Sequence, residues 1–221
     1  MSGNVLNAMT VDVEDFFHVS AFESVITPEQ WKDYQPRVDK NTRTLLDMFA
    51  KHNVKSTFFV LGWVAERYPE LIKEIHAQGH EIASHGYAHR RATEQTREQF
   101  TADVTRSKDH LEALLGEKLT GYRAPSFSIG YDNEWAFEVL AELGFQYSSS
   151  TYPVKHDLYG TPDWPRFAYM RKEGIIEIPI PTHKVMGRQT PIGGGGYFRL
   201  YPYTLTKTLI SSYLKKEKQP Y

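Results

Sequence analysis

Two short segments hold the residues whose types and spacing could do chemistry. His85 and His89 are four residues apart, which places two imidazoles on one helical face or in one tight loop, close enough to share a cation. Asp12, Glu14 and Asp15 form an acidic cluster after an apolar run, which is costly unless a positive charge neutralises it. Two imidazoles and one carboxylate, with positions left for water and substrate, make a catalytic metal set, and a second carboxylate could act as the base.

Each segment also has an interpretation without chemistry. A histidine pair at this spacing usually binds no metal on spacing alone, and Gly86 excludes the HExxH pattern of zinc proteases. An acidic cluster after a strand is often a solvated strand end or a helix N-cap. Arg123 could orient the base carboxylate, although taken alone it predicts only a surface salt bridge. The metal interpretation is favoured because the acids and histidines occur together and both follow apolar runs.

The elements that must position these residues alternate between apolar strands and amphipathic helices. Strands are predicted at 5–13, 56–61, 81–84, 118–122, 145–149 and 175–180. Helices are predicted at 41–51 and 69–78, in a long stretch that ends at Gly116, from an N-cap at Asp132 to Leu143, and at 205–214. This alternation indicates βα units and a parallel sheet. The acids, the histidines and Arg123 then meet at the carboxyl ends of the strands, in a β/α barrel or in an open α/β sheet.

The composition excludes several classes of partner. The 221 residues show no linker or low-complexity tract, so we expect one domain over 1–221. A net charge of −1 gives no electrostatic reason to expect nucleic acid or an anionic membrane. The absence of cysteine leaves only nitrogen and oxygen ligands for a metal. No secretory signal and no apolar run of ~18 residues is found, so no membrane span is expected and the default location is cytoplasmic.

Three motifs in the right order give the chain a family resemblance. Residues 10–15 (TVDVED) are similar to a TFDDG-type motif, residues 85–89 (HGYAH) to H-[ST]-x-x-H, and residues 123–127 (RAPSF) to R-x-P-[YF]. The chain therefore resembles the polysaccharide deacetylases, the NodB homology group also called carbohydrate esterase family four. The segments DVEDFFHV, YSSSTYPVKHDLYG and GGGGYFRLYP are similar to the branch found with bacterial exopolysaccharide and exosortase gene clusters.

The resemblance implies a fold, an activity and a role for each matched position. The fold would be a distorted (β/α)7-type barrel, and the activity metal-dependent removal of N-acetyl groups from a polysaccharide, with release of acetate. Asp12 would be the general base, Arg123 its partner, and the backbone N–H of Ser126 would help to hold the oxyanion. The metal, zinc with cobalt or nickel as alternatives, would be bound by His85, His89 and one carboxylate. Glu14 is slightly favoured over Asp15 because it shares a strand face with Asp12.

The chain departs from the family pattern at several positions. Gly86 stands where Ser or Thr is usual, and Ser126 where Tyr is usual, which suggests an altered substrate pocket. The family's acid lies in a Leu-x-His motif that has no clean copy here, and His183 and His156 are more typical of loop histidines. Relatives of this branch continue beyond a position like Tyr221, so we expect a C-terminally truncated chain that lacks the acid and the last strand of the barrel.

Two alternative functions remain open from the sequence. One is an amidohydrolase for a cyclic amide or ureide, since relatives of the same fold carry out that reaction. The other is a non-catalytic glycan-binding protein, which the missing acid favours and the intact metal motif opposes. An N-acetylated glycan is the expected partner in the preferred interpretation. Candidates for sugar stacking are aromatic residues for which core packing is the competing explanation, namely Phe16, Phe17, Trp164 and Tyr197.

Overall fold

A computed structural model of the chain describes residues 7–156 and 159–221. Its main sheet has seven strands in the order β1-β2-β3-β4-β5-β7-β6, and β8 and β9 form a separate hairpin. The strands of the main sheet are β1 Thr10–Val13, β2 Thr57–Val60, β3 Glu81–Ser84, β4 Gly121–Tyr122, β5 Tyr147–Ser148, β6 Tyr169–Met170 and β7 Ile176–Glu177. Within the main sheet, all strand pairings are parallel except that of β6 with β7. The predicted α/β class with a mostly parallel sheet is confirmed, and no pairing joins the edge strands β1 and β6 within the described residues.

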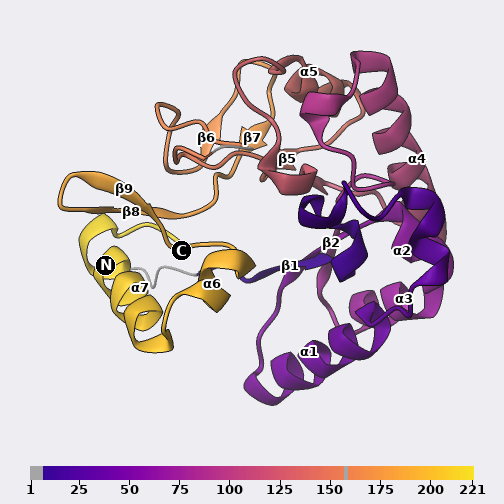
Figure 1. The fold of residues 1–221 in the computed structure, drawn as a ribbon, viewed down its shortest axis with the longest axis horizontal. Coiled ribbons are helices and arrows are strands. Elements are labelled where there is room, and N and C mark those ends of the chain that lie inside the picture. Colours follow the sequence, from indigo (N-terminus) through magenta and orange to yellow (C-terminus); the bar gives the residue numbers. More distant parts are fainter. Residues whose placement is uncertain (1–6, 157–158) are drawn as a thin grey trace.

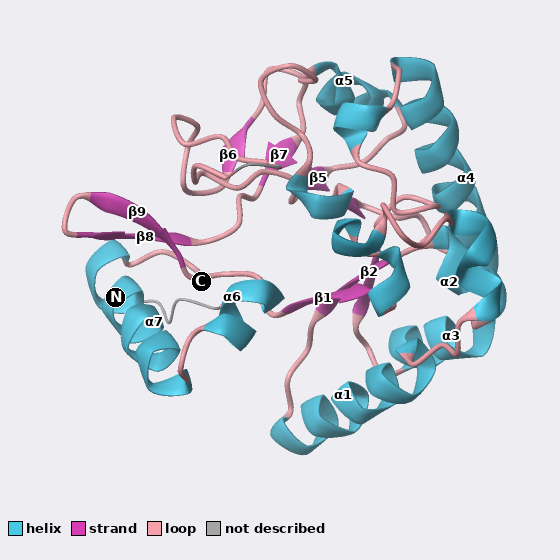
Figure 2. Ribbon diagram, in the orientation of Figure 1, coloured by secondary structure: helices cyan, strands magenta, loops and turns pink. Residues whose placement is uncertain are grey.

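The helices lie on two sides of this sheet (Figure 1). Helices α1 to α5 form an arc along one side, and α6 and α7 lie with the β8–β9 hairpin at the opposite end of the molecule (Figures 1 and 2). Their bounds are α1 Val38–His52, α2 Gly62–Arg67, α3 Pro69–Ala77, α4 Arg97–Leu115, α5 Trp135–Glu142, α6 Gly195–Leu200 and α7 Tyr203–Glu217. None of the described helices combines the length and the apolar character that a membrane crossing requires.

Helix α4 shows how the sequence sets the limits of an element. Thr96 accepts a hydrogen bond from the amide of Gln99 and closes a capping box at the start of the helix. Gly116 ends the helix with a φ of +72°, a backbone conformation that glycine adopts at little cost. Between these ends, Phe100, Val104 and Leu111 are buried in the main core. The helix is therefore fixed against β3, beside the strand end that carries the predicted histidines.

Several predicted elements differ from those observed. The strand predicted at 5–13 is β1, Thr10–Val13, and residues 5 and 6 lie outside the described part of the chain. Asp132 is not the N-cap of α5, which starts after Glu134, because the Asn133 side chain instead closes the preceding loop on Ser128 and Gly130. The strand β6 and the short helix α2 were not predicted.

The C-terminal elements also differ from the prediction. The hairpin strands β8 Thr182–Val185 and β9 Arg188–Pro191 were not predicted. The helix predicted at 205–214 is α7, Tyr203–Glu217, whose buried side chains are those of Thr206 and Tyr213, whereas Leu205 is 43% exposed. The glycine run 193–196 is divided between a loop and a helix, because α6 already begins at Gly195.

Candidate active site

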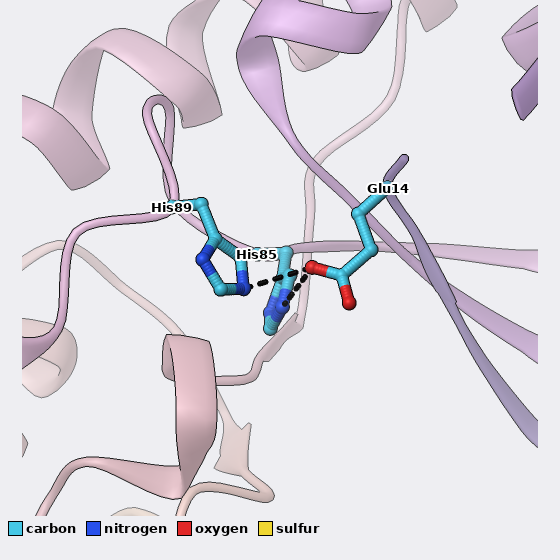
Figure 3. A group of neighbouring side chains, drawn as sticks. All are labelled: Glu14, His85 and His89. Carbon is cyan, nitrogen blue, oxygen red and sulfur yellow. Dashed lines mark ion pairs between the residues drawn. The ribbon is translucent and has the colours of Figure 1, made fainter. Parts of the chain in front are cut away.

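Glu14, His85 and His89 meet where β1 and β3 end (Figure 3). The Oε2 atom of Glu14 is 2.8 Å from Nε2 of His89 and 3.8 Å from Nε2 of His85. Both imidazoles are buried, and the Glu14 side chain is 22% exposed. One carboxylate oxygen and two imidazole nitrogens thus lie within 4.8 Å of one another, which is a donor set that suits a divalent cation.

The hydrogen bonds of this group fit a metal ligand set. Nδ1 of His85 is 2.8 Å from the carbonyl oxygen of Arg123. Because a carbonyl only accepts, Nδ1 carries the proton and Nε2 keeps the lone pair that a cation needs. Oε2 of Glu14 is buried against the Nε2 atoms of the two histidines, and Nδ1 of His89 is buried with no hydrogen-bond partner among the described residues. A cation between the three side chains would satisfy the Glu14 oxygen.

The electrostatics favour the ligand forms of Glu14 and His85. Burial acts to raise the pKa of Glu14, but the attraction and hydrogen bond of His89, with smaller contributions from His85 and His18, outweigh it and lower the pKa to about 2. Burial lowers the pKa of His85. For His89, burial also acts to lower the pKa, but Glu14 outweighs it and the pKa rises. Metal binding therefore competes with protonation of His89.

Arg123 fixes the predicted base, Asp12. Its Nη1 donates to Oδ1 of Asp12 at 2.8 Å and to the hydroxyl of Thr10 at 3.0 Å. Its Nη2 and Nε donate to the hydroxyl and the carbonyl of Ser149, and the guanidinium lies 4.0 Å from the centre of the Phe59 ring. Arg123 is buried, whereas the Asp12 side chain is 27% exposed. The Asp12 carboxylate is thus held in one place and still reaches solvent.

The structure places Asp15 away from the two histidines, although it was a candidate ligand. Its carboxylate accepts hydrogen bonds from the backbone amides of Phe16, Arg37 and Val38. It caps the short 3-10 helix η1, Phe16–His18, and joins it to the start of α1. Side chains alternate along β1 and its extension, so Glu14 shares a face with Asp12 and Asp15 points to the other side.

Ser126 lies in a loop of unusual backbone conformation that follows β4. Ser126 has a φ of +54° and Phe127 a φ of +51°, so two residues other than glycine adopt left-handed conformations in succession. The Ser126 hydroxyl is 2.9 Å from that of Ser20, and the amide of Ala124 donates to the hydroxyl of Ser150. These contacts fix the direction of the backbone at Ser126, where an oxyanion donor was predicted.

The remaining candidates have structural contacts. His183 is buried on β8, with Nε2 3.0 Å from the hydroxyl of Ser212 and Nδ1 3.4 Å from a carboxylate oxygen of Glu217, both on α7. The ring of His156 stacks on that of Tyr159 at 3.9 Å. The four aromatic candidates all pack against neighbours: Phe16 and Phe17 with Tyr34, Trp164 with Phe137, and Tyr197 with Tyr152.

Two polar residues beside the site, the buried His18 and the half-buried Asp103, were not predicted. The Nδ1 atom of His18 accepts a hydrogen bond from the amide of Asp15, and burial is the main cause that lowers the pKa of His18 to about 3. Asp103, on α4, accepts hydrogen bonds from the amides of Tyr87 and Ala88. The sequence does contain a signal for His18, because this histidine lies just after the acidic cluster of Asp12, Glu14 and Asp15. Asp103 has no local signal, because it reaches the loop only through the packing of α4.

Comparison with known proteins relates the chain to the polysaccharide deacetylases. The polysaccharide deacetylase family model matches residues 32–148, and a domain of unknown function, DUF3473, matches residues 149–221. A peptidoglycan-N-acetylglucosamine deacetylase of Bacillus cereus is 31% identical over 105 residues, which cover 48% of this chain and 47% of that protein. A chitin deacetylase of Arthroderma benhamiae is 29% identical over 55% of this chain and 33% of its own length. The chain thus spans about half or less of the curated relatives it matches.

A solved structure supports the same relationship. The Mycobacterium smegmatis protein, named for the polysaccharide deacetylases, has a TM-score of 0.60 and 27% sequence identity, and the match covers 78% of this chain and 57% of that one. Asp12 and Glu14 precede the segment that the deacetylase model matches, whereas His85, His89 and Arg123 lie inside it. Because that segment is more than half of the chain, the chain belongs to the polysaccharide deacetylase family.

Proposed function

We propose that this chain is a metal-dependent hydrolase that removes N-acetyl groups from the amino sugars of a polysaccharide. Glu14, His85 and His89 form a cation-binding donor set in a member of the polysaccharide deacetylase family, and this observation is the main support. Arg123 joins the set to the base: its carbonyl accepts from His85, and its guanidinium donates to Asp12. Relatives named as peptidoglycan and chitin deacetylases support an acetylated glycan as substrate.

Each side chain then has a chemical task. A divalent cation held by Glu14, His85 and His89 would supply Lewis acidity toward the acetamide carbonyl. Asp12, oriented by Arg123, accepts the proton of the attacking water. The backbone N–H of Ser126 donates to the oxyanion that develops at the carbonyl. Zinc is the metal that the donor set favours, with cobalt or nickel as alternatives, and a bacterial exopolysaccharide is the proposed polymer.

Metal content and acetate release together test this function. The wild type should hold one divalent ion per chain and release acetate from N-acetylglucosamine oligomers. His85→Ala/His89→Ala should lose both properties, whereas Asp12→Asn should keep the metal and lose most of the activity, on the order of 10²-fold or more. A wild type that binds no zinc, cobalt or nickel would rule out the metal-dependent mechanism.

The contacts of His183 favour one second candidate, a non-catalytic glycan-binding protein. This histidine was a candidate for the acid that protonates the leaving amine, but its two ring nitrogens face Ser212 and Glu217 of α7. Binding of N-acetylglucosamine oligomers by the metal-loaded protein, without acetate release, would support this candidate. Acetate release that depends on Asp12 would exclude it.

A further inference from the structure

The loop between the two histidines is held from two sides by neighbouring helices. On one side, the carbonyl oxygens of Gly86 and Tyr87 accept hydrogen bonds from the amides of Gly62 and Trp63, at the start of α2. On the other side, the amides of Tyr87 and Ala88 donate to the two carboxylate oxygens of Asp103, at 2.8 and 3.3 Å. Among the described residues, Asp103 is the only carboxylate that accepts hydrogen bonds from the backbone amides of this loop.

The fit between the loop and Asp103 depends on Gly86. Its φ is +75°, and a Cβ placed there would lie 2.9 Å from Oδ2 of Asp103. Any side chain at this position would therefore strain the backbone and press on the carboxylate. Gly86 therefore leaves the space in which the Asp103 carboxylate of α4 binds the loop amides.

The two histidines are oriented by different means. The ring of His85 is fixed by its hydrogen bond to the carbonyl of Arg123, the usual way to orient a metal-ligating imidazole. His89 has no such bond at Nδ1 within the described residues, and its backbone has a φ of +50°. Apart from its contact with Glu14 at Nε2, the position of the His89 ring therefore depends on the backbone that precedes it, which is the segment bound by Asp103.

We propose that Asp103 is a positioning residue for the metal centre, which places His89 by binding the amides of Tyr87 and Ala88. This inference rests on the proposed metal site of Glu14, His85 and His89. Asp103 would touch neither metal nor substrate. Each of its two carboxylate oxygens accepts a hydrogen bond from one backbone amide. An asparagine cannot accept both, because its side-chain amide has one oxygen that accepts and one nitrogen that donates.

The affinity of the metal-free protein for Zn²⁺ or Co²⁺, measured by isothermal titration calorimetry, tests Asp103. Asp103→Asn should weaken metal affinity by about 10- to 100-fold, the loss typical of a residue that orients a ligand. Asp109→Asn is the matched control, because Asp109 is exposed on the same helix and should leave the affinity unchanged. Equal affinities of the wild type and a folded Asp103→Asn would overturn the role of Asp103 and leave the metal site intact.

Hydrogen exchange in the wild type gives a test that needs no variant. The amides of Tyr87 and Ala88 should be protected in the metal-free protein, because both donate to the partly buried carboxylate of Asp103. Rapid exchange of both amides would overturn the inference even if Asp103→Asn fails to fold. Absence of metal binding by the wild type would instead overturn the proposed function, so the two failures can be distinguished.

Discussion

Arg123 connects the candidate ligand His85 to the candidate base Asp12 through both its backbone and its side chain. The guanidinium makes hydrogen bonds to Asp12, Thr10 and Ser149 and lies over Phe59. Such a set needs the planar fork of an arginine, since a lysine ammonium cannot direct donors to all of these groups. The carbonyl of the same residue orients His85, a contact that a substitution of the side chain leaves in place.

Arg123→Lys should therefore separate catalysis from metal binding. We expect metal content close to that of the wild type, and acetate release lower by on the order of 10²-fold, because Asp12 is no longer held in one orientation. Arg188→Lys, at an exposed position of β9, is the control and should change neither quantity. Full activity in Arg123→Lys would show that Asp12 needs no such partner.

Glu177 provides a test of stability against pH. It is fully buried on β7, and burial raises its pKa from 4.5 to about 7 against the hydrogen bonds from Thr151 and Ser150. The folded chain therefore retains a proton that the unfolded chain loses. Its contribution to stability is complete below pH 4.5 and is lost as the pH rises to about 7. Urea denaturation should show wild-type stability falling over this range by on the order of 2 kcal/mol.

Glu177→Gln should remove this part of the pH dependence, because glutamine keeps an acceptor for the amides of Ser150 and Thr151 and cannot ionise. Its stability relative to the wild type should increase from pH 5 to pH 8. Parallel stability curves for the two proteins over this range would mean that Glu177 does not titrate there.

Residue types and their order were enough to predict most of the site, but not the contacts that hold it. Asp12, Glu14, His85, His89 and Arg123 were named from acids, histidines and arginine at strand ends, and the structure brings them to one place. The alternation of a strand separates Glu14 from Asp15, which accepts backbone amides instead. Asp103 could not be predicted, because its distance from the loop depends on how α4 packs and not on spacing in the sequence.

The helices and strands differ in how well the sequence predicts them, for physical reasons. Helix α4 has a capping box and a terminal glycine, so its end was predicted correctly. The β8–β9 hairpin was missed because its strands are largely polar, although its turn at Met186 and Gly187 has two positive φ values, as in a type I′ turn. Helix α7 was predicted at 205–214, where Leu205, Leu209 and Ile210 have helical spacing, but the side chains it buries are those of Thr206 and Tyr213.

Arg166 joins the C-terminal elements to one another. It donates to the carbonyl and hydroxyl of Thr182 on β8 and to Glu217 at the end of α7. Its side chain is only 12% exposed, and that of Glu217 19%. Loss of this partly buried group leaves the acceptors in β8 and α7 unsatisfied.

Arg166→Met should lower the free energy of unfolding by roughly 1–3 kcal/mol. Lys207→Met removes an exposed cation from α7 and should have little effect. Urea denaturation measures the change, and hydrogen exchange should show the amides of 203–217 opening more readily in Arg166→Met. Equal stability of the two variants would show that α7 is held by its apolar contacts alone.

The main sheet continues across the boundary between the two matched family segments, which falls between residues 148 and 149. Strand β5 lies before the boundary and pairs with β7 beyond it. Ser149 and Ser150, just past the boundary, accept hydrogen bonds from Arg123 and Ala124 of the site. The second segment therefore contributes hydrogen-bond acceptors to the site, whereas the candidate metal ligands and the candidate base all precede this segment in the sequence.

Because sheet and site both cross this boundary, we expect the chain to unfold in one cooperative transition. Three of the four tryptophans (31, 63 and 135) precede the boundary and Trp164 lies beyond it, so fluorescence reports mainly on the part before the boundary, while far-UV circular dichroism also includes α7 of the second segment. Urea unfolding curves from fluorescence and circular dichroism should therefore coincide. An early loss of helical signal, with fluorescence unchanged, would mean that residues 149–221 unfold independently. In that case the hydrogen bonds from Arg123 to Ser149 would not couple the two segments, and the orientation of Asp12 would depend on the first segment alone.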